Sequence, residues 1–237
     1  MRRGDGAGYT ASVDDLLAAI GRAFGTSTLA GLAPGLVVPD PDGWIPATDL
    51  TGADITLLVT AARRRWDARP HVAAALMWKA YSYWLSLPAA FGWVVARRVP
   101  HLTAAQVLVR LDAPDAPVRI GLRPGIPFTH DDPSALRRVL LDEHVTPLLD
   151  AFQREVRIAR RPLLGSLSAG LAHATRHAVR AVPGASTDDI DTLLKALDLQ
   201  DLIEWEHGRL RRRTCCLAFT LPEPRICSDC CYRPHPN

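Results

Sequence analysis

The sequence predicts an α+β fold with a helix-rich body, a small antiparallel sheet and a cysteine-rich C-terminal segment. Three observations lead to this prediction. Apolar residues recur at helical spacing through most of the chain. Between residues 106 and 122 they alternate with a period of two, which is typical of strands. All the cysteines lie between Cys215 and Cys231, so the end of the chain differs in composition from the rest.

The first helix is expected from Ser12 to about Gly25. Ser12 is a favourable N-cap residue, because its hydroxyl can accept a hydrogen bond from a free backbone N–H of the first turn. Asp14 and Asp15 place negative charge at the positive end of the helix dipole. Gly25 is a typical stop signal.

A second helix is expected after a stretch that is rich in glycine and proline. Within residues 26–50 only two short pieces, 36–38 and 44–45, have an extended pattern. Thr51 can then cap a helix that continues through about Arg65, because apolar residues return at helical spacing.

Residues 71–98 are expected to form a buried helix with a break near Pro88. Residues 80–96 carry no charge, which approaches the minimum length of a membrane span. Serine, proline and glycine dilute this stretch, and Lys79 and Arg97 bracket it closely, so we predict a core helix and no membrane span. The aromatic residues expected in the core here are Trp78, Trp84 and Trp93.

Residues 106–111 and 118–122 alternate as two strands joined by a turn at 112–117. A helix is expected to open at Asp131 and to run to about Arg160, followed by another helix over 163–181.

Ser186 and Asp189 have the spacing of a capping box ahead of a further helix. The acidic residues at this point, which we interpret as helix N-terminal charges and not as catalysts, are Asp188, Asp189 and Asp191. Residues 209–220 are expected to be extended and to lead into a surface loop that carries the cysteines.

Composition narrows the class of protein. A chain of 237 residues can bury roughly 70% of its unfolded surface, and 48% hydrophobic with 22% charged residues is typical of a globular protein. The net charge of +3 is too small to indicate nucleic-acid binding. No secretory signal is recognisable at the N-terminus, so we expect the thiols to lie in a reducing, cytoplasmic compartment, where clustered cysteines indicate metal or redox chemistry.

The cysteines follow the pattern C-C-x10-C-x2-C, formed by Cys215, Cys216, Cys227 and Cys230. Four clustered thiolates select zinc, copper(I) or an iron–sulfur cluster. Neighbouring side chains of an extended chain point to opposite faces, so Cys215 and Cys216 do not easily chelate one ion. Zinc prefers two well-spaced pairs, whereas a binuclear [2Fe–2S] cluster is a wider target that also takes four thiolates. The spacing favours [2Fe–2S]; zinc, disulfides and core thiols remain alternatives.

This motif, preceded by Arg212-Arg213-Thr214, resembles the C-terminal signature of the FhuF-like ferric siderophore reductases. The resemblance is specific over residues 204–233. It is weaker at 140–149, which follow the form L-x-x-x-H-x-x-P-L-L, and at 161–166, where Leu164 and Ser166 depart from the family's Trp-Gly-Asn.

The resemblance implies a [2Fe–2S] cluster on Cys215, Cys216, Cys227 and Cys230 and one-electron reduction of a ferric siderophore in the cytoplasm, of the hydroxamate type by family analogy. We therefore expect residues 1–200 to form the siderophore-reductase body and residues 201–237 to form the cluster-binding segment, packed as one domain. The alternative function is a zinc-stabilised binding or interaction module without redox activity. A relationship to the longer siderophore synthetases, which carry a similar C-terminal domain, is disfavoured by the length of the chain.

Two further expectations concern the surroundings of the cysteines. Cys231 is an additional cysteine beside the motif, and the family spacing favours Cys230 over it as a ligand. The arginines expected to tune the potential of the cluster, or to dock an acidic partner, are Arg211, Arg212, Arg213 and Arg225. Solvated positions, or pairing with nearby acidic residues, would explain them equally well.

The remaining motifs are weaker. His173 and His177 share a helix face, but no H-E-x-x-H pattern accompanies them, so we interpret them as surface histidines. No dinucleotide fingerprint follows a predicted strand. We therefore expect a separate electron donor, a ferredoxin or a ferredoxin reductase.

Overall fold

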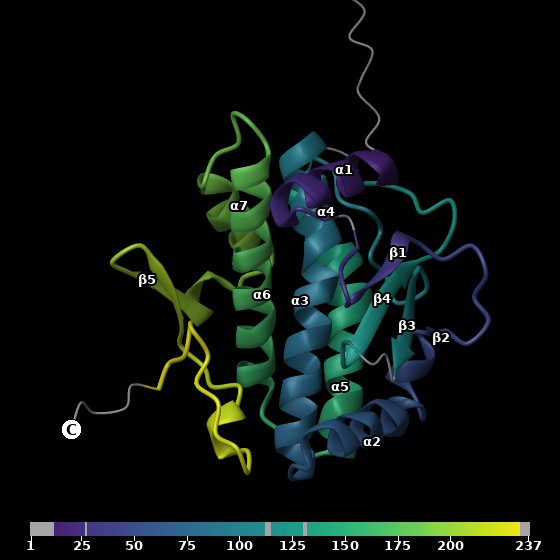
Figure 1. Cartoon of the computed structure of the whole chain (residues 1–237), viewed down its shortest axis with the longest axis vertical. Coiled ribbons are helices and arrows are strands. Elements are labelled where there is room, and N and C mark those ends of the chain that lie inside the picture. Colours follow the sequence, from purple (N-terminus) through teal and green to yellow (C-terminus); the bar gives the residue numbers. More distant parts are fainter. Residues whose placement is uncertain (1–11, 27, 112–114, 130–131, 233–237) are drawn as a thin grey trace, which may run out of the picture.

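The computed structural model describes residues 12–26, 28–111, 115–129 and 132–232 (Figure 1). The helices are α1 (Val13–Phe24), α2 (Ile55–Trp66), α3 (Pro70–Ala96), α4 (Pro133–Leu136), α5 (Thr146–Glu155), α6 (Arg160–Ala181) and α7 (Asp188–Ala196). A π-helix, η2 (Arg137–Val145), joins α4 to α5, and short 3-10 helices lie at η1 (Asp49–Thr51), η3 (Gln200–Leu202) and η4 (Ala218–Thr220). The strands are β1 (Leu32–Val37), β2 (Ile45–Pro46), β3 (Val107–Leu111), β4 (Val118–Leu122), β5 (Ile203–Glu206) and β6 (Arg209–Arg212). The predicted α+β class is confirmed.

Helices α3 and α6 lie side by side at the centre of the molecule (Figure 1). Gly170 permits this close approach, because a Cβ atom there would lie 3.2 Å from the Cα of Tyr83. The sheet packs against α3, and the β5–β6 hairpin packs against the side of α6 away from the sheet (Figure 1). The C-terminal segment therefore meets the central helices and not the sheet.

Helix α3 is buried over most of its surface, as the predicted core helix should be. No helix within the described ranges combines the length and hydropathy needed to cross a membrane. The predicted break at Pro88 is wrong, since the helix continues through this buried residue. Packing on its neighbours outweighs the single backbone hydrogen bond that proline removes. Trp78 and Trp93 are buried, while Trp84 is only half-buried against the core.

The main sheet is mixed and has the order β1-β4-β3-β2. The predicted hairpin is confirmed by the antiparallel pairing of β3 with β4, although residues 112–114 of its turn lie outside the described residues. The expectation of a purely antiparallel sheet is wrong, because β1 runs parallel to β4. These two strands are joined through β2, η1, α2, α3 and β3, so no tight turn fixes their relative direction. The β5–β6 hairpin was not predicted as a pair of strands; positive φ angles at His207 and Gly208 form its turn.

Several predicted boundaries and caps need correction. The capping box of Ser12 with Asp15 is present, and Gly25 ends α1 in the left-handed conformation. Thr51 does not cap α2, which begins four residues later at Ile55. The helix expected over 131–160 is made of α4, η2 and α5 and ends at Glu155, with Asp131 outside the described residues.

The second predicted capping box is absent. Thr187 is the N-cap of α7, and the Ser186 hydroxyl accepts from the backbone N–H of Asp188. The carboxylate of Asp189 is drawn away from the helix end, because it is buried and accepts hydrogen bonds from Trp93 and Arg97.

The resemblance segment 140–149 contains a buried hydrogen-bonded pair. His144 and Tyr81 are both fully buried, with 2.5 Å between Nε2 and the phenol oxygen. The second ring nitrogen of His144, Nδ1, lies 2.7 Å from the carbonyl oxygen of Leu102 and must donate to it. In the neutral ring Nε2 therefore accepts a hydrogen bond from the hydroxyl of Tyr81. Burial lowers the pKa of His144 to about 4 and raises that of Tyr81, so both groups stay neutral.

We expect acid to destabilise the fold through His144. The unfolded histidine takes up a proton below its ordinary pKa of 6.5, whereas burial keeps the folded one neutral down to a pKa of about 4. The stabilising effect is thus complete above pH 6.5 and is lost as the pH falls towards 4. Between pH 7 and pH 4.5 this linkage removes about 2 kcal/mol from the free energy of unfolding. Urea unfolding of wild type and His144→Gln at both pH values checks it. An equal pH dependence in the two proteins would contradict the assignment.

Candidate metal centre

The cysteine segment is anchored to the start of α3 by a small apolar cluster. The buried side chains of Cys216, Ala218 and Leu221 pack there against Val72 and Leu76. Residues beyond Arg212 leave the strand, so the prediction of an extended chain to Thr220 holds only as far as β6. Burial nevertheless alternates here with a period of two: Leu210, Arg212, Thr214 and Cys216 face inward.

The closest pair of sulfur atoms belongs to Cys216 and Cys227, whose Sγ atoms are 3.3 Å apart. Lys79 of α3 reaches this pair, with Nζ 2.8 Å from the sulfur of Cys227 and 4.0 Å from that of Cys216. A donated S–H···S hydrogen bond from Cys227 and the charge of Lys79 lower the pKa of Cys216 to about 5, and the pKa of Cys227 is raised by sharing the remaining proton with Cys216. The ammonium lies nearer to Cys227, so we assign the single negative charge to the pair and not to one sulfur.

The other cysteines interact among themselves. Cys231 is in hydrogen-bonding contact with Cys215, and burial together with its thiol neighbours raises its pKa to about 11. The sulfur of Cys230 accepts from the backbone N–H of Tyr232, 3.4 Å away. Across the ranges that the structure describes, no group of three or more His, Cys, Asp or Glu side chains is gathered closely enough to hold one metal ion. The thiols are thus arranged in pairs, and the convergence of all four motif cysteines remains a prediction.

Buried hydrogen-bond donors without partners face the same region. The Arg212 side chain is 2% exposed, and none of its three guanidinium nitrogens has a hydrogen-bond partner among the described residues. The hydroxyl of Thr214 is also buried and, within the same ranges, unpartnered. Arg212 is close enough to Cys216 to help lower the pKa of that thiol. Such donors fit an anion held by the cysteines.

Asp229, within the C-x2-C turn, fixes the position of this turn. Its backbone carbonyl accepts from the N–H of Arg212 at 2.9 Å, and its carboxylate lies 3.2 Å from Nε2 of His173 on α6. Burial raises the pKa of Asp229, but the bond to His173 and the charges of Arg212 and Lys79 leave it below the usual value. His173 and His177 are both partly exposed, as their interpretation as surface histidines requires, but His173 is bonded to Asp229 and His177 packs against Phe24.

The absence of a side chain at Gly165 brings α6 against the Arg-Arg-Thr segment. A Cβ atom at this position would lie 1.9 Å from the Oγ1 of Thr214 and 2.9 Å from its Cβ. The glycine of the second resemblance segment thus packs directly beside the residues that precede Cys215.

The structure separates the four arginines that the sequence singled out. Arg211 binds Glu206 at 3.0 Å and the backbone carbonyl of Cys230, and Arg213 binds Glu204 at 3.2 Å on the surface. Arg225 is exposed. Arg212 alone among these four is buried, and its guanidinium has no hydrogen-bond acceptor among the described residues, only an ion pair with Asp229 at 3.8 Å.

Lys79 and Asp229 were missed by sequence reasoning, and His173 was noticed only as a surface histidine. Lys79, His173 and Asp229 lie in different elements, and their meeting is a product of the fold. The only signal in the sequence was that Lys79 is one of two lysines in the chain and borders an uncharged stretch.

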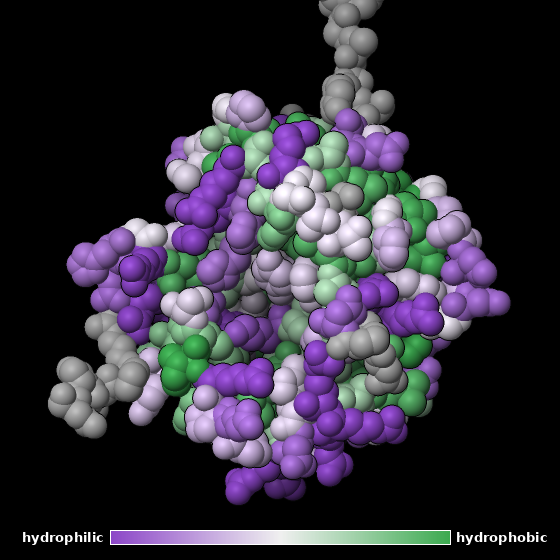
Figure 2. Space-filling model, viewed as in Figure 1, coloured by the Kyte–Doolittle hydropathy of each residue, from purple (hydrophilic) through white to green (hydrophobic). Residues whose placement is uncertain are grey.

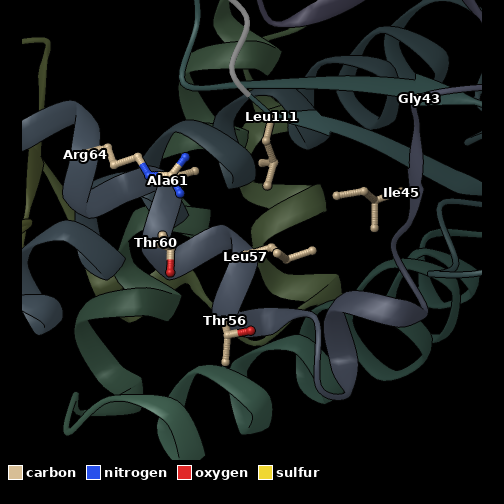
Figure 3. Close-up of a pocket in the computed structure, with 8 residues that line it drawn as sticks. All are labelled: Gly43, Ile45, Thr56, Leu57, Thr60, Ala61, Arg64 and Leu111. Carbon is tan, nitrogen blue, oxygen red and sulfur yellow. The ribbon is translucent and has the colours of Figure 1, made fainter.

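Two hollows border the cysteine segment, and a third lies elsewhere. A polar groove of about 600 Å³ is lined by Glu206, His207, Arg209, Leu210, Arg211 and Ser228. A smaller one of about 250 Å³ lies between Trp66 and Leu221. The third hollow, about 300 Å³, lies between α2 and the β2–β3 edge and contains no cysteine (Figure 3).

Apolar side chains are exposed around the cysteines. Phe219, Ile226 and Tyr232 all reach solvent, and the rings of Phe219 and Tyr232 stack with their centroids 5.4 Å apart. The face in Figure 2 is mostly hydrophilic, with apolar atoms among the polar ones over the C-terminal segment. A comparison with known protein families finds no match to this chain, and neither does a comparison with curated proteins.

Proposed function

We propose that this protein is a cytoplasmic iron–sulfur ferric-siderophore reductase that releases iron by one-electron reduction of a bound Fe(III) complex. The observation that carries the proposal is the close thiol pair of Cys216 and Cys227, with Lys79 against it and with buried donors in the same segment that lack hydrogen-bond partners among the described residues. Each iron of a [2Fe–2S] cluster takes two thiolates, so paired sulfurs suit this group better than a single zinc ion, which requires all its ligands at one point.

The residues that would hold the cluster are Cys215, Cys216, Cys227 and Cys230. When bound, such a cluster supplies a carrier for one electron. The fold contributes the rest: the apolar contacts of Cys216 exclude water from one side, and Lys79 and Arg212 offset the negative charge of the thiolates.

The overall reaction is balanced by a single electron. A ferredoxin or a ferredoxin reductase gives up one electron, and the Fe(III) of the substrate becomes Fe(II). Hard, charged oxygen ligands hold Fe(II) less firmly than Fe(III), so the metal is released without a proton donor or nucleophile from the protein.

The polar groove beside the C-x2-C turn is the proposed substrate site. Ser228 lines it and follows Cys227 in the chain, which supports placing the substrate near the cysteine segment. Its cavity of about 600 Å³ is within the range of small-molecule sites. Arg209, His207 and Glu206 supply the polar contacts that a hydroxamate complex requires.

The cofactor is tested directly by metal and sulfide analysis of anaerobically purified protein. We expect equal amounts of iron and acid-labile sulfide, about two of each per chain, and a paramagnetic signal after reduction. Activity is tested by trapping Fe(II) from a ferric hydroxamate in the presence of ferredoxin, ferredoxin reductase and NADPH. Colourless protein that contains zinc and no sulfide would replace this proposal with the zinc-stabilised interaction module.

The fourth ligand can be identified by comparing two serine variants. We expect Cys230→Ser to lose most of the cluster and Cys231→Ser to keep it, because the motif spacing favours Cys230. The contact between Cys231 and Cys215 makes this a sharp test. Iron and sulfide contents of the two variants decide it. If Cys231→Ser lost its iron and sulfide while Cys230→Ser kept them, the assignment would be reversed.

A further inference from the structure

We infer that the partly buried Lys79 and the buried Arg212 form a cationic clamp, which binds the anionic group held by the cysteines and favours its reduced state. This inference rests on the proposed function and deepens it. Lys79 approaches from α3 and Arg212 from β6, so the two charges are contributed by parts of the chain that are far apart in sequence.

The state of Arg212 is the first argument. Burying a guanidinium is unfavourable unless its N–H groups find acceptors, and here none of its three nitrogens has one within the described residues. Asp229 is the nearest carboxylate, but its oxygen is 3.8 Å from Nε, beyond hydrogen-bonding distance, and it is already bonded to His173. The fold thus holds a positive charge in place without neutralising it fully.

The direction of the side chain is the second argument. Arg212, Thr214 and Cys216 share the inward face of the segment, and the hydroxyl of Thr214 also lacks a partner among the described residues. The backbone N–H of Arg212 bonds to the carbonyl of Asp229, which ties this face to the C-x2-C turn. Donors on this face are therefore fixed beside the thiols.

Lys79 provides the second half of the clamp. Its ammonium is 2.8 Å from Cys227, a distance at which it donates a charge-assisted hydrogen bond to the sulfur. A group that becomes more negative on reduction gains from nearby positive charge and from hydrogen bonds to its sulfurs. The clamp should thus raise the reduction potential and make electron uptake from the donor more favourable.

The test compares Lys79→Met and Arg212→Met with two controls in the full-length, anaerobically purified protein. Arg213→Met is the matched control, because Arg213 adjoins Arg212 but is exposed and paired with Glu204. Lys79→Arg keeps the charge. In redox titrations followed by paramagnetic resonance, we expect the equilibrium constant for reduction to fall about tenfold in each methionine variant. For a one-electron couple this lowers the reduction potential by about 59 mV. Arg213→Met should match wild type, and Lys79→Arg should recover most of the loss.

A second measurement separates binding from a structural role. In metal-free protein, Arg212→Met should melt at the wild-type temperature or above, because it removes a buried guanidinium that has no hydrogen-bond acceptor and only a long ion pair with Asp229, at 3.8 Å. Loss of the cluster from Arg212→Met with unchanged metal-free melting also supports the clamp. Unchanged potentials in both methionine variants, or a lower metal-free melting temperature for Arg212→Met, would overturn it. Wild-type protein without iron and sulfide would instead refute the proposed function, and the metal-free comparison would still decide whether the buried Arg212 stabilises the fold by itself.

Discussion

Replacement of Cys216 by serine should abolish the cluster and, with it, the reduction of ferric siderophore. Cys216 is the most buried cysteine, at 4% exposure. Its sulfur lies 3.3 Å from that of Cys227, and its side chain packs against Val72 and Leu76. A serine hydroxyl has nearly the same shape but offers a hard oxygen where iron–sulfur chemistry requires a soft thiolate. We expect iron and sulfide to fall to background and Fe(II) release to drop by about a hundredfold or more, since every electron must pass through the site.

The fold itself should survive this substitution. The side chain is small and its apolar neighbours remain, so the metal-free variant should melt close to metal-free wild type. Cys231→Ser, a cysteine substitution in the same segment, is the control for handling and oxidation. A Cys216→Ser protein that kept its sulfide, its visible spectrum and its activity would remove this residue from the ligand set.

The sequence predicts a structural feature correctly where that feature depends only on residues close together in the chain. The capping box of Ser12 and the hairpin of β3 and β4 are of this kind, because each is specified within a few residues. The parallel pairing of β1 with β4 was missed, since it depends on a long connection that contains the helices α2 and α3 and the strands β2 and β3. Pro88 was misjudged for a similar reason: its local preference is overridden by packing on α3 that only the whole fold supplies.

The same distinction applies to the candidate metal centre. Cysteine spacing indicates a thiol site because the chemistry resides in one short segment. It does not indicate Lys79 or His173, which are separated from Cys227 and Asp229 by much of the chain. The composition of the segment also does not indicate which of its arginines is buried, and so does not distinguish Arg212 from its neighbours. That choice depends on the alternation that turns every second residue after Leu210 inward, which becomes visible only when the burial of this segment is known.

The second large effect is expected at Gly165, where α6 meets the segment that precedes the cysteines. In Gly165→Ala the new Cβ would overlap Thr214, and rotation of the threonine does not relieve this, because the Cβ of Thr214 would also be only 2.9 Å away. The segment from Arg212 to Cys216 must then move away from α6. We expect a loss of about 1–3 kcal/mol in the free energy of unfolding and a large reduction in iron and sulfide content. Chemical unfolding and metal analysis measure the two effects.

A compensating substitution shows whether the clash is the cause. Thr214→Gly removes the atoms that the alanine would strike, so Gly165→Ala combined with Thr214→Gly should be more stable than the sum of the single effects predicts. Gly52→Ala is the matched control: its Cβ would make only an ordinary contact, 3.5 Å from the carbonyl oxygen of Asp49, and its effect should be small. If Gly165→Ala were as stable as Gly52→Ala and bound a full complement of iron, the position of α6 against the cysteine segment would not control the site. If the double variant showed no rescue, the loss would have to arise within α6 and not at its contact with Thr214.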